Sequence, residues 1–300
     1  MARGFLDKLL GRSAPPPDVA DALAELQRLS AEHPSLAEPA AVLIDLLPIL
    51  CESPSNAAAP AIPPDRAAAK LAGGIPLLRG ESVSLDAGLL RRRWAEVCAI
   101  LGRHQQSDIP AQLAAAVKRG RLSVEELVTA VLAGRAEEVA NRADALGLDA
   151  GLTATVLRFV LFPSLVSLNS ARLSLCSGTA WEHGYCPACG SWPLLGEFRG
   201  LEQVRWLRCG LCAAEWEFPR LACPFCDNRD HQQLGYLHVE GEEGQRRAST
   251  CEECRGYVKM LATLGPLSPP RLLVVDVATL YLDLAAAECG YAVPGAGPTS

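Results

Sequence analysis

The chain has 300 residues, of which 49% are hydrophobic and 21% are charged, and it carries a formal net charge of −6. These values are typical of a folded protein of about two domains, and they argue against extensive disorder and against general attraction to nucleic acid or anionic lipid. Since the N-terminal apolar stretch is short and broken by charge, and no run of about 18 apolar residues is apparent, we expect a cytoplasmic protein without a signal peptide or membrane span.

Residues 1–175 are rich in Ala and Leu and predict an all-helical domain of about six to eight helices. Apolar residues recur at helical spacing in four long segments, 17–29, 36–50, 83–103 and 152–175. Residues 52–65 contain four prolines and predict a connecting loop. Ser123 and Glu126 form a capping box that predicts the start of a further helix. Pro163 should kink or split the last segment. This half lacks a Gly-rich phosphate loop and an obvious acid–base cluster, so we interpret it as a scaffold or docking surface.

After Cys176 the pattern changes to short strands. Residues 204–208 and 214–218 alternate between apolar and polar on either side of a cysteine pair, which predicts a hairpin. Residues 233–239 and 245–250 repeat the arrangement, and Gly241–Gly244 should form the turn between them. The predicted fold class is therefore α+β, with a helical domain followed by two small ribbons.

Eight of the twelve cysteines form four Cys-x-x-Cys pairs within 69 residues. The pairs are Cys186/Cys189, Cys209/Cys212, Cys223/Cys226 and Cys251/Cys254. Each pair can direct two thiolates at one metal, and two pairs complete a tetrahedral four-cysteine site. Sequential pairing, first with second and third with fourth, fits better than interleaved pairing because each half contains its own hairpin. Four thiolates suit zinc and also the iron of a rubredoxin-like site, so the pattern predicts two metal ions and leaves the element open.

Other residues carry weaker signals. Gly190 follows a cysteine pair and should adopt a left-handed conformation, which Asp227 and Asn228 also tolerate. His183 is a weak candidate for a replacement ligand, and His231 and His238 should be exposed. The isolated cysteines Cys51, Cys98 and Cys289 lie in apolar stretches and should be buried, while Cys176 lies at the junction of the two halves. Four tryptophans should cover the small core of the first ribbon, Trp181, Trp192, Trp206 and Trp216.

These motifs together carry a family pattern. The pattern runs through Cys186–Pro193, Arg205–Trp216, Cys223–Cys226, Cys251–Lys259 and Asp276–Tyr291. It resembles the formate dehydrogenase accessory protein family, FdhE. In that family paired aspartates commonly precede the Leu-x-Leu-Asp segment, whereas here Val275 precedes Asp276, which puts in doubt any role that needs both carboxylates.

The composition and the cysteine pattern divide the chain into a helical domain at residues 1–175, a first rubredoxin-like or zinc-ribbon module at 183–220, and a second module with a C-terminal segment at 221–291. The family resemblance covers the two modules. It implies a cytoplasmic maturation chaperone that is needed for formate dehydrogenase activity and is not itself an enzyme. It also implies that the metal-stabilised C-terminal half binds the formate dehydrogenase catalytic subunit, and it favours iron over zinc.

Two other classes of protein remain open at this point. A nucleic-acid-binding ribbon protein would use the arginines and tryptophans of the ribbons, although the acidic total and interspersed glutamates disfavour it. A thiol-redox protein would need one Cys-x-x-Cys pair left free of metal, or would respond through loss of a bound iron.

Overall fold

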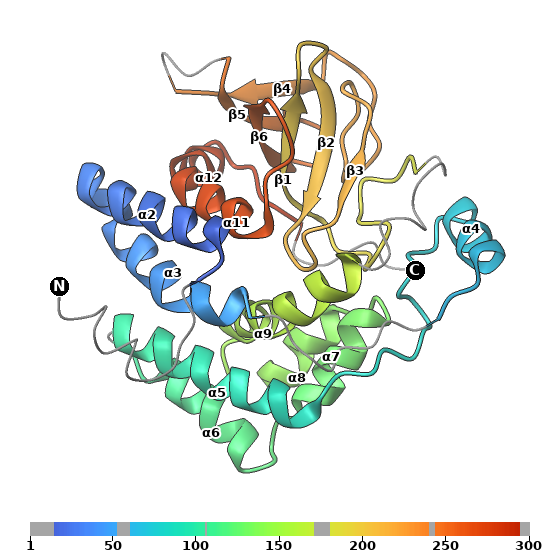
Figure 1. Ribbon diagram of the computed structural model, residues 1–300. Helices are drawn as coiled ribbons and strands as arrows, with labels where there is room; N and C mark the ends of the chain where they lie inside the picture. Colours follow the sequence, from blue (N-terminus) through green and yellow to red (C-terminus); the bar gives the residue numbers. More distant parts are fainter. Residues whose placement is uncertain (1–14, 53–60, 106, 171–180, 240–243, 295–300) are drawn as a thin grey trace.

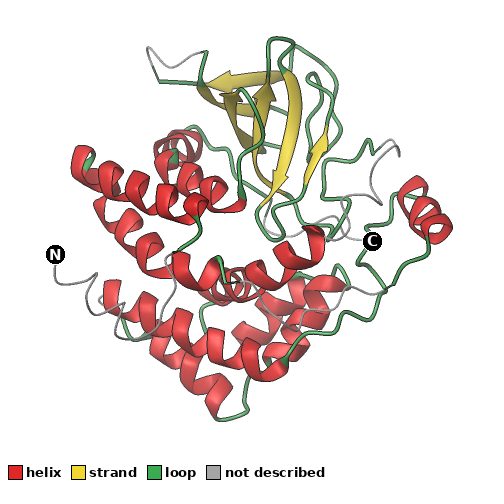
Figure 2. Cartoon of the chain, viewed as in Figure 1, coloured by secondary structure: helices red, strands yellow, loops and turns green. Residues whose placement is uncertain are grey.

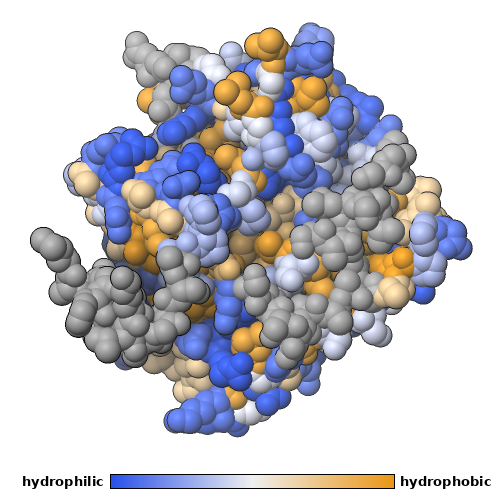
Figure 3. Space-filling view, viewed as in Figure 1, coloured by the Kyte–Doolittle hydropathy of each residue, from blue (hydrophilic) through white to orange (hydrophobic). Residues whose placement is uncertain are grey.

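The computed structural model describes residues 15–52, 61–105, 107–170, 181–239 and 244–294. Figure 1 shows a helical part, drawn mostly in blue and green, and a sheet at the opposite end of the molecule. The last two helices, in red, return to lie between the sheet and the first helices of the chain. Figure 2 shows this separation of helices from strands most directly. On the face seen in Figure 3, hydrophilic residues divide the hydrophobic surface into small patches.

Eight α-helices and one 3-10 turn lie in the described part of the N-terminal half. They are α2 (Pro17–Glu32), η1 (Pro34–Leu36), α3 (Ala37–Leu50), α4 (Pro64–Ala72), α5 (Ala87–His104), α6 (Ile109–Lys118), α7 (Val124–Leu132), α8 (Glu137–Ala145) and α9 (Ala150–Ser170). The all-helical prediction for this half is therefore confirmed.

Capping side chains set where two of these helices begin. The Ser123 side chain accepts a hydrogen bond of 3.2 Å from the Glu126 N–H, as the capping box predicts. Asp86 accepts from the Leu89 N–H at 2.9 Å, so α5 begins at Ala87. The predicted start at residue 83 is thus too early, because Asp86 takes the extended conformation of a cap.

The helix α9 is long, apolar and deeply packed. Val160, Leu161 and Leu165 are fully buried, and the helix contacts α3, α5, α7 and α8. It continues through Pro163 as a single helix, so the predicted split does not occur. Residues 150–169 are long and apolar enough to cross a membrane, but 56% of that window is buried inside the protein. The core helix of a soluble domain passes the same test, so α9 is weak support for a span.

The strands form one six-stranded sheet with the order β3-β2-β1-β6-β5-β4. The strands are β1 (Pro193–Arg199), β2 (Val204–Cys209), β3 (Glu215–Glu217), β4 (Leu234–Leu237), β5 (Arg246–Cys251) and β6 (Tyr257–Thr263). Each ribbon contributes three antiparallel strands, and the two ribbons join through parallel pairing of β1 with β6. The two predicted modules are therefore present but fused edge to edge. The sequence missed β1 and β6, and most of the predicted 241–244 turn lies outside the described residues.

Two C-terminal helices, α11 (Pro269–Ala278) and α12 (Leu280–Glu288), follow the sheet. The first packs against α2 and α3, and its Leu272, Leu273 and Val274 are buried in the same core as the N-terminal helices. The second packs against β4, β5 and β6. The end of the chain therefore joins the sheet to the helical layer.

Candidate metal centres

All four Cys-x-x-Cys pairs fold into the same turn. In each turn the N–H of the first cysteine donates to the carbonyl five residues later, at 2.9–3.0 Å: Cys186 to Ser191, Cys209 to Ala214, Cys223 to Asn228 and Cys251 to Gly256. The residue after the second cysteine has a positive φ in every case: 83° at Gly190, 54° at Ala213, 57° at Asp227 and 55° at Arg255. The expectation for Gly190 is confirmed. For Ala213 and Arg255 this left-handed conformation is unfavourable by roughly 1 kcal/mol each. Other contacts of the turn must therefore hold these two residues in it.

The first cluster consists of Cys186, Cys189, Cys209 and Cys212, whose sulfur atoms all lie within 4.8 Å of one another. The Sγ atoms of Cys186 and Cys212 are 3.6 Å apart, and those of Cys189 and Cys209 are 3.5 Å apart. A tetrahedral metal with bonds to sulfur of about 2.3 Å has sulfur–sulfur edges of about 3.8 Å. A disulfide would bring two sulfurs to about 2.05 Å. The spacing therefore fits a metal shell and excludes disulfides.

The second cluster consists of Cys223, Cys226, Cys251 and Cys254, again with all sulfurs within 4.8 Å. The Sγ distances are 3.6 Å between Cys223 and Cys254 and 3.7 Å between Cys226 and Cys251. The structure thus groups the pairs sequentially, and interleaved pairing is wrong. Assignment of these eight residues as ligands of a bound ion stays a prediction.

Burial separates the two clusters. Every cysteine of the first cluster is at most 3% exposed. In the second cluster Cys223 and Cys251 are buried, whereas Cys226 and Cys254 are exposed. Solvent and small reagents can therefore reach the second cluster directly.

The electrostatics of the first cluster favour a cation. Burial raises the pKa of the Cys186 thiol, while hydrogen bonds from the three neighbouring thiols lower the pKa of Cys189. Several thiolates cannot share one buried site without a positive charge between them. Backbone N–H groups also donate hydrogen bonds to sulfur in both clusters. The Leu211 nitrogen lies 3.4 Å from the Cys209 sulfur, and the Phe225 nitrogen lies 3.5 Å from the Cys223 sulfur. This donor set fits zinc or iron.

The first cluster is also bonded to the helical half. The N–H groups of Leu77 and Leu78 each donate at 2.8 Å to the carbonyls of Pro187 and Ala188, which lie between Cys186 and Cys189. The Tyr185 hydroxyl donates to the Gly74 carbonyl at 2.7 Å. The segment after α4 therefore pairs with the first metal turn, a contact that the sequence does not reveal.

The aromatic residues around the first cluster have structural positions. His183 belongs to neither cluster, and its ring stacks on Tyr185 at 4.9 Å. The Trp216 indole N–H donates to the His183 carbonyl at 3.2 Å. Trp216 and Trp181 are 4% and 9% exposed, as expected for residues that cover a small core.

The isolated residues follow the predictions only in part. Cys98 is buried and Cys51 is half-buried, and burial raises the pKa of both thiols to about 12. Cys289 is exposed, so the prediction of burial is wrong for this residue, which lies just after the end of α12. His231 and His238 are exposed as expected. Cys176 lies outside the described residues.

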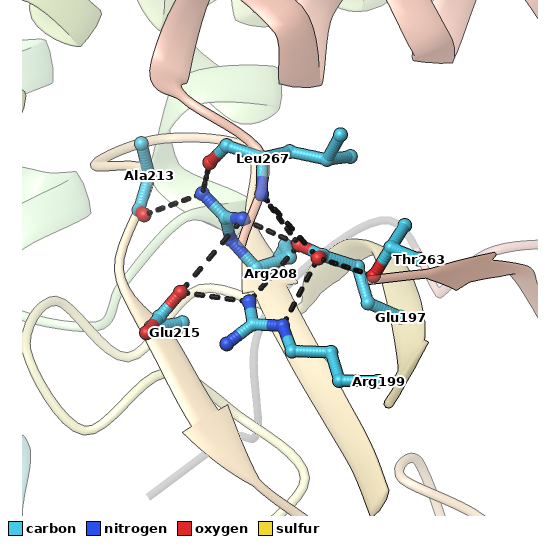
Figure 4. Close-up of polar contacts among 7 residues, drawn as sticks. All are labelled: Glu197, Arg199, Arg208, Ala213, Glu215, Thr263 and Leu267. Atoms are coloured by element: carbon cyan, nitrogen blue, oxygen red, sulfur yellow. Dashed lines mark hydrogen bonds and ion pairs between the residues drawn. The ribbon is translucent and has the colours of Figure 1, made fainter. Parts of the chain in front are cut away.

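A buried ion network lies next to the first cluster (Figure 4). The Glu197 side chain is fully buried and accepts hydrogen bonds from Arg199 at 3.0 and 3.1 Å and from Arg208. It also accepts from the Thr263 hydroxyl at 3.1 Å and the Leu267 N–H at 3.3 Å. Burial alone would raise the pKa of Glu197, but the two guanidinium groups hold this pKa below its usual value. The network ties β1 and β2 to the segment after β6.

A second buried charge joins the sheet to the C-terminal helices. Lys259 on β6 is 3% exposed, and its ammonium group donates at 2.7 Å to both Asp276 and Asp283. The Tyr257 hydroxyl donates to Asp283 at 2.8 Å. Val275 is 8% exposed and lies in the apolar core, so the residue before Asp276 makes no part of this charge cluster. Lys259, Asp276 and Asp283 all belong to the family pattern found in the sequence, but the sequence does not show that Lys259 contacts the two aspartates.

Two family models match adjoining parts of the chain. The model described as the central domain of FdhE matches residues 185–220, and the model of the FdhE C-terminal domain matches residues 221–298. Each of the two matched regions thus contains one four-cysteine cluster.

Curated relatives show the same similarity. An FdhE homologue of Stutzerimonas stutzeri is 38% identical over 149 residues, which cover 43% of this chain and 46% of that protein. An FdhE homologue of Pseudomonas aeruginosa is 36% identical over 171 residues, 52% of this chain and 54% of the relative. A homologue from Aquifex aeolicus is 31% identical over 150 residues, 48% and 52% of the two chains. The chain therefore matches about half the length of these relatives.

The whole fold is similar to a solved structure. The crystal structure of the FdhE protein from Pseudomonas aeruginosa matches with a TM-score of 0.62 and 24% identity, covering 95% of this chain and 96% of that one. The likeness extends over the helical half as well as the sheet.

Proposed function

We propose that the protein is an accessory factor for formate dehydrogenase rather than an enzyme, because residues 185–298 match the central and C-terminal domains of FdhE. The observation that carries this proposal is the match of both FdhE domains to the part of the chain that contains both four-cysteine clusters. In this proposal the protein acts in the cytoplasm as a maturation chaperone that binds the catalytic subunit.

The proposed role of the clusters is to hold a rigid binding surface. A bound metal neutralises the thiolates and cross-links the strands of a ribbon too small to be stable by its own core. The donor sets suit either zinc or iron, and we favour iron from the family resemblance. Rigid support matters because an interface gains affinity when its contact groups are ordered before the partner arrives.

The partner surface cannot use every tryptophan that the sequence offered. Trp216 is 4% exposed and already donates to a protein carbonyl, so it is not available as an anchor. Trp192 and Trp206 are half-buried, and Arg199 stacks over the Trp206 ring at 4.8 Å. These two side chains remain candidates for contact with the catalytic subunit.

The two rival classes lose support from the geometry. Arg208 is 2% exposed and its guanidinium is bound to protein oxygens, so it cannot contact nucleic acid phosphates. A thiol-redox role would need a Cys-x-x-Cys pair outside a metal cluster. Within the described residues, all four pairs belong to the two clusters.

The test is binding of the formate dehydrogenase catalytic subunit from the same organism to the full-length chain purified without oxygen. The double variant Cys186→Ser/Cys189→Ser should lose binding and lower cellular formate dehydrogenase activity, with the transcript of the catalytic subunit unchanged. Cys289→Ser is the matched control, because Cys289 is exposed and lies outside both clusters. Full activity in cells that carry only the double variant would contradict a role for the first cluster.

A further inference from the structure

The two faces of the sheet differ in what covers them. On one face Ala248 and Tyr257 pack with Leu282 and Ala286 of α12. The opposite face carries a small apolar cluster of Phe198, Val258 and Met260 with Phe225 beside it. Side chains of successive strand residues point to opposite faces, and Phe198 is opposite Arg205 in the β1–β2 register, so these two lie on the second face.

This second face contains a hollow of about 230 Å³. Strands from both ribbons line it, with Phe198 and Arg205 from the first and Tyr236 and Arg247 from the second. Arg220 lines it from the segment that connects the two ribbons. Cys223 and Cys251 also reach its wall, so the hollow lies beside the second cluster.

Arg205 lies at the base of the hollow and is 3% exposed. One end of its guanidinium donates to the carbonyls of Pro219 at 3.1 Å and Ala222 at 2.8 Å. Its Nε is buried without a hydrogen-bond partner, as are the Nε atoms of Arg208 and three other arginines, so the guanidinium keeps a donor that protein groups do not use.

Two further guanidinium groups flank the aromatic ring of Phe198. The Arg220 and Arg247 groups lie 5.2 and 4.6 Å from the centroid of Phe198, and Arg247 is also 5.1 Å from the Tyr236 ring. Burial, followed by the positive charge of Arg220, lowers the pKa of Arg247. The positive charges therefore repel each other across the hollow.

No carboxylate among the described residues forms an ion pair with Arg205, Arg220 or Arg247. The contrast with the other face is direct, because Arg199 and Arg208 there are paired with Glu197 and Glu215. The same sheet thus supplies carboxylates to one set of arginines, whereas the other set has only the thiolates of the second cluster nearby, of which Cys223 acts on Arg205. Guanidinium groups without a carboxylate partner can take their counter-charge from a ligand.

We propose that this hollow binds an oxyanion, a carboxylate or phosphate group, on a ligand whose apolar part lies against Phe198 and Tyr236. The guanidinium fork matches the geometry of both oxyanions, and the aromatic rings offer an apolar surface beside it. The volume of 230 Å³ is below the range of about 300–1,000 Å³ of pockets for drug-sized ligands, so one such group with an adjoining ring fills it. This proposal does not depend on the role in formate dehydrogenase maturation.

The experiment is calorimetric titration of the full-length, metal-loaded protein at constant ionic strength with two probes. Phenyl phosphate represents a free phosphorylated ligand, and the peptide N-acetyl-Phe-Glu represents an acidic segment of a protein. Saturable binding of either is expected, and the tighter probe identifies the source. Arg247→Ala and Arg220→Ala should each weaken binding at least about tenfold, as expected for loss of a charge-assisted hydrogen bond.

The matched control is Arg246→Ala, which removes the same charge from the adjacent residue on the opposite face of β5. Arg220 is exposed, so its replacement leaves the fold intact and keeps the test decisive if Arg247→Ala is unstable. Failure of both probes to bind would overturn the proposal. So would equal weakening by Arg246→Ala, because that result would show attraction by net charge alone.

Discussion

Buried charges on β1 and β6 hold the sheet in place. Glu197 is surrounded by two arginines, and Lys259 is held between two aspartates from α11 and α12. Glu197 lies opposite Leu261 in the β1–β6 register, and Leu261 is two residues from Lys259. Since residues two apart on a strand share a face, both charges lie on the same face of the sheet. Loss of one partner from such a site leaves a charge buried without compensation, which typically destabilises a protein by about 3–5 kcal/mol.

Glu197 should make stability depend on acid pH. Its pKa is lower in the folded chain than the value of about 4.3 for an unfolded chain, so its stabilising effect is present above that pH. The effect is lost as the pH falls through the folded pKa. Glu197→Gln should therefore lower the free energy of unfolding by about 3 kcal/mol at pH 7, and this difference from the wild type should narrow below about pH 4.

Urea unfolding of both proteins over that pH range measures the difference. Loss of metal at low pH affects both alike, so only the difference reports Glu197. Glu217→Gln is the control, since Glu217 is an exposed glutamate of β3 in the same sheet. A difference that stays constant with pH would show that the carboxylate does not titrate in the folded protein as its contacts require.

At the scale of elements, local signals predicted local structure and little more. Ser123 began a helix as its capping box indicates, and alternating residues located β2, β3, β4 and β5. The parallel pair β1–β6 joins residues about sixty positions apart and has no turn signal of its own. The helix α11 buries four consecutive residues, 272–275, so no helical period distinguishes an inner from an outer face.

The candidate site was more predictable than the sheet that carries it. Two-residue gaps between cysteines and one hairpin per half were enough to predict which sulfurs meet, because each hairpin brings its own pairs together. The sequence could not predict that the first cluster is buried and the second is partly exposed. That difference arises from distant segments, such as residues 74–79, which cover the first turn only after the chain has folded.

Unequal exposure should make the two metals leave at different rates. We expect two ions per loaded chain, each with a sulfur-only shell at about 2.3 Å by X-ray absorption. A chelator should remove the ion of the second cluster first, because Cys226 and Cys254 are exposed while the first cluster is enclosed. Native mass spectrometry during chelation should show a persistent one-metal species.

Cys226→Ser is the variant that identifies the phases, since it should abolish the fast loss and leave the slow loss unchanged. A single phase for both ions, or one ion in fully loaded and reduced protein, would contradict two sites of different accessibility.

At the scale of the whole molecule, two sets of contacts among the described residues join the helical half to the sheet and its C-terminal helices. The segment after α4 bonds to the first metal turn through Leu77 and Leu78, and α11 packs against α2 and α3. Among the described residues, no backbone hydrogen bond links the second cluster to a helix of the N-terminal half. Loss of the metal of the first cluster should therefore affect the helical half far more than loss of the metal of the second cluster.

Hydrogen–deuterium exchange of two single variants tests this asymmetry. Cys189→Ser should raise exchange at Leu77 and Leu78, because their acceptors lie between Cys186 and Cys189 and lose their fixed position without the metal. Cys254→Ser should raise exchange in β4 and β5 and leave Leu77 and Leu78 protected. Both variants should keep the circular dichroism of the helices, since α9 and its neighbours are packed by apolar contacts that involve no metal. If Leu77 and Leu78 stay protected in Cys189→Ser, the helical half must hold that segment by itself, and the first metal would stabilise the ribbon alone.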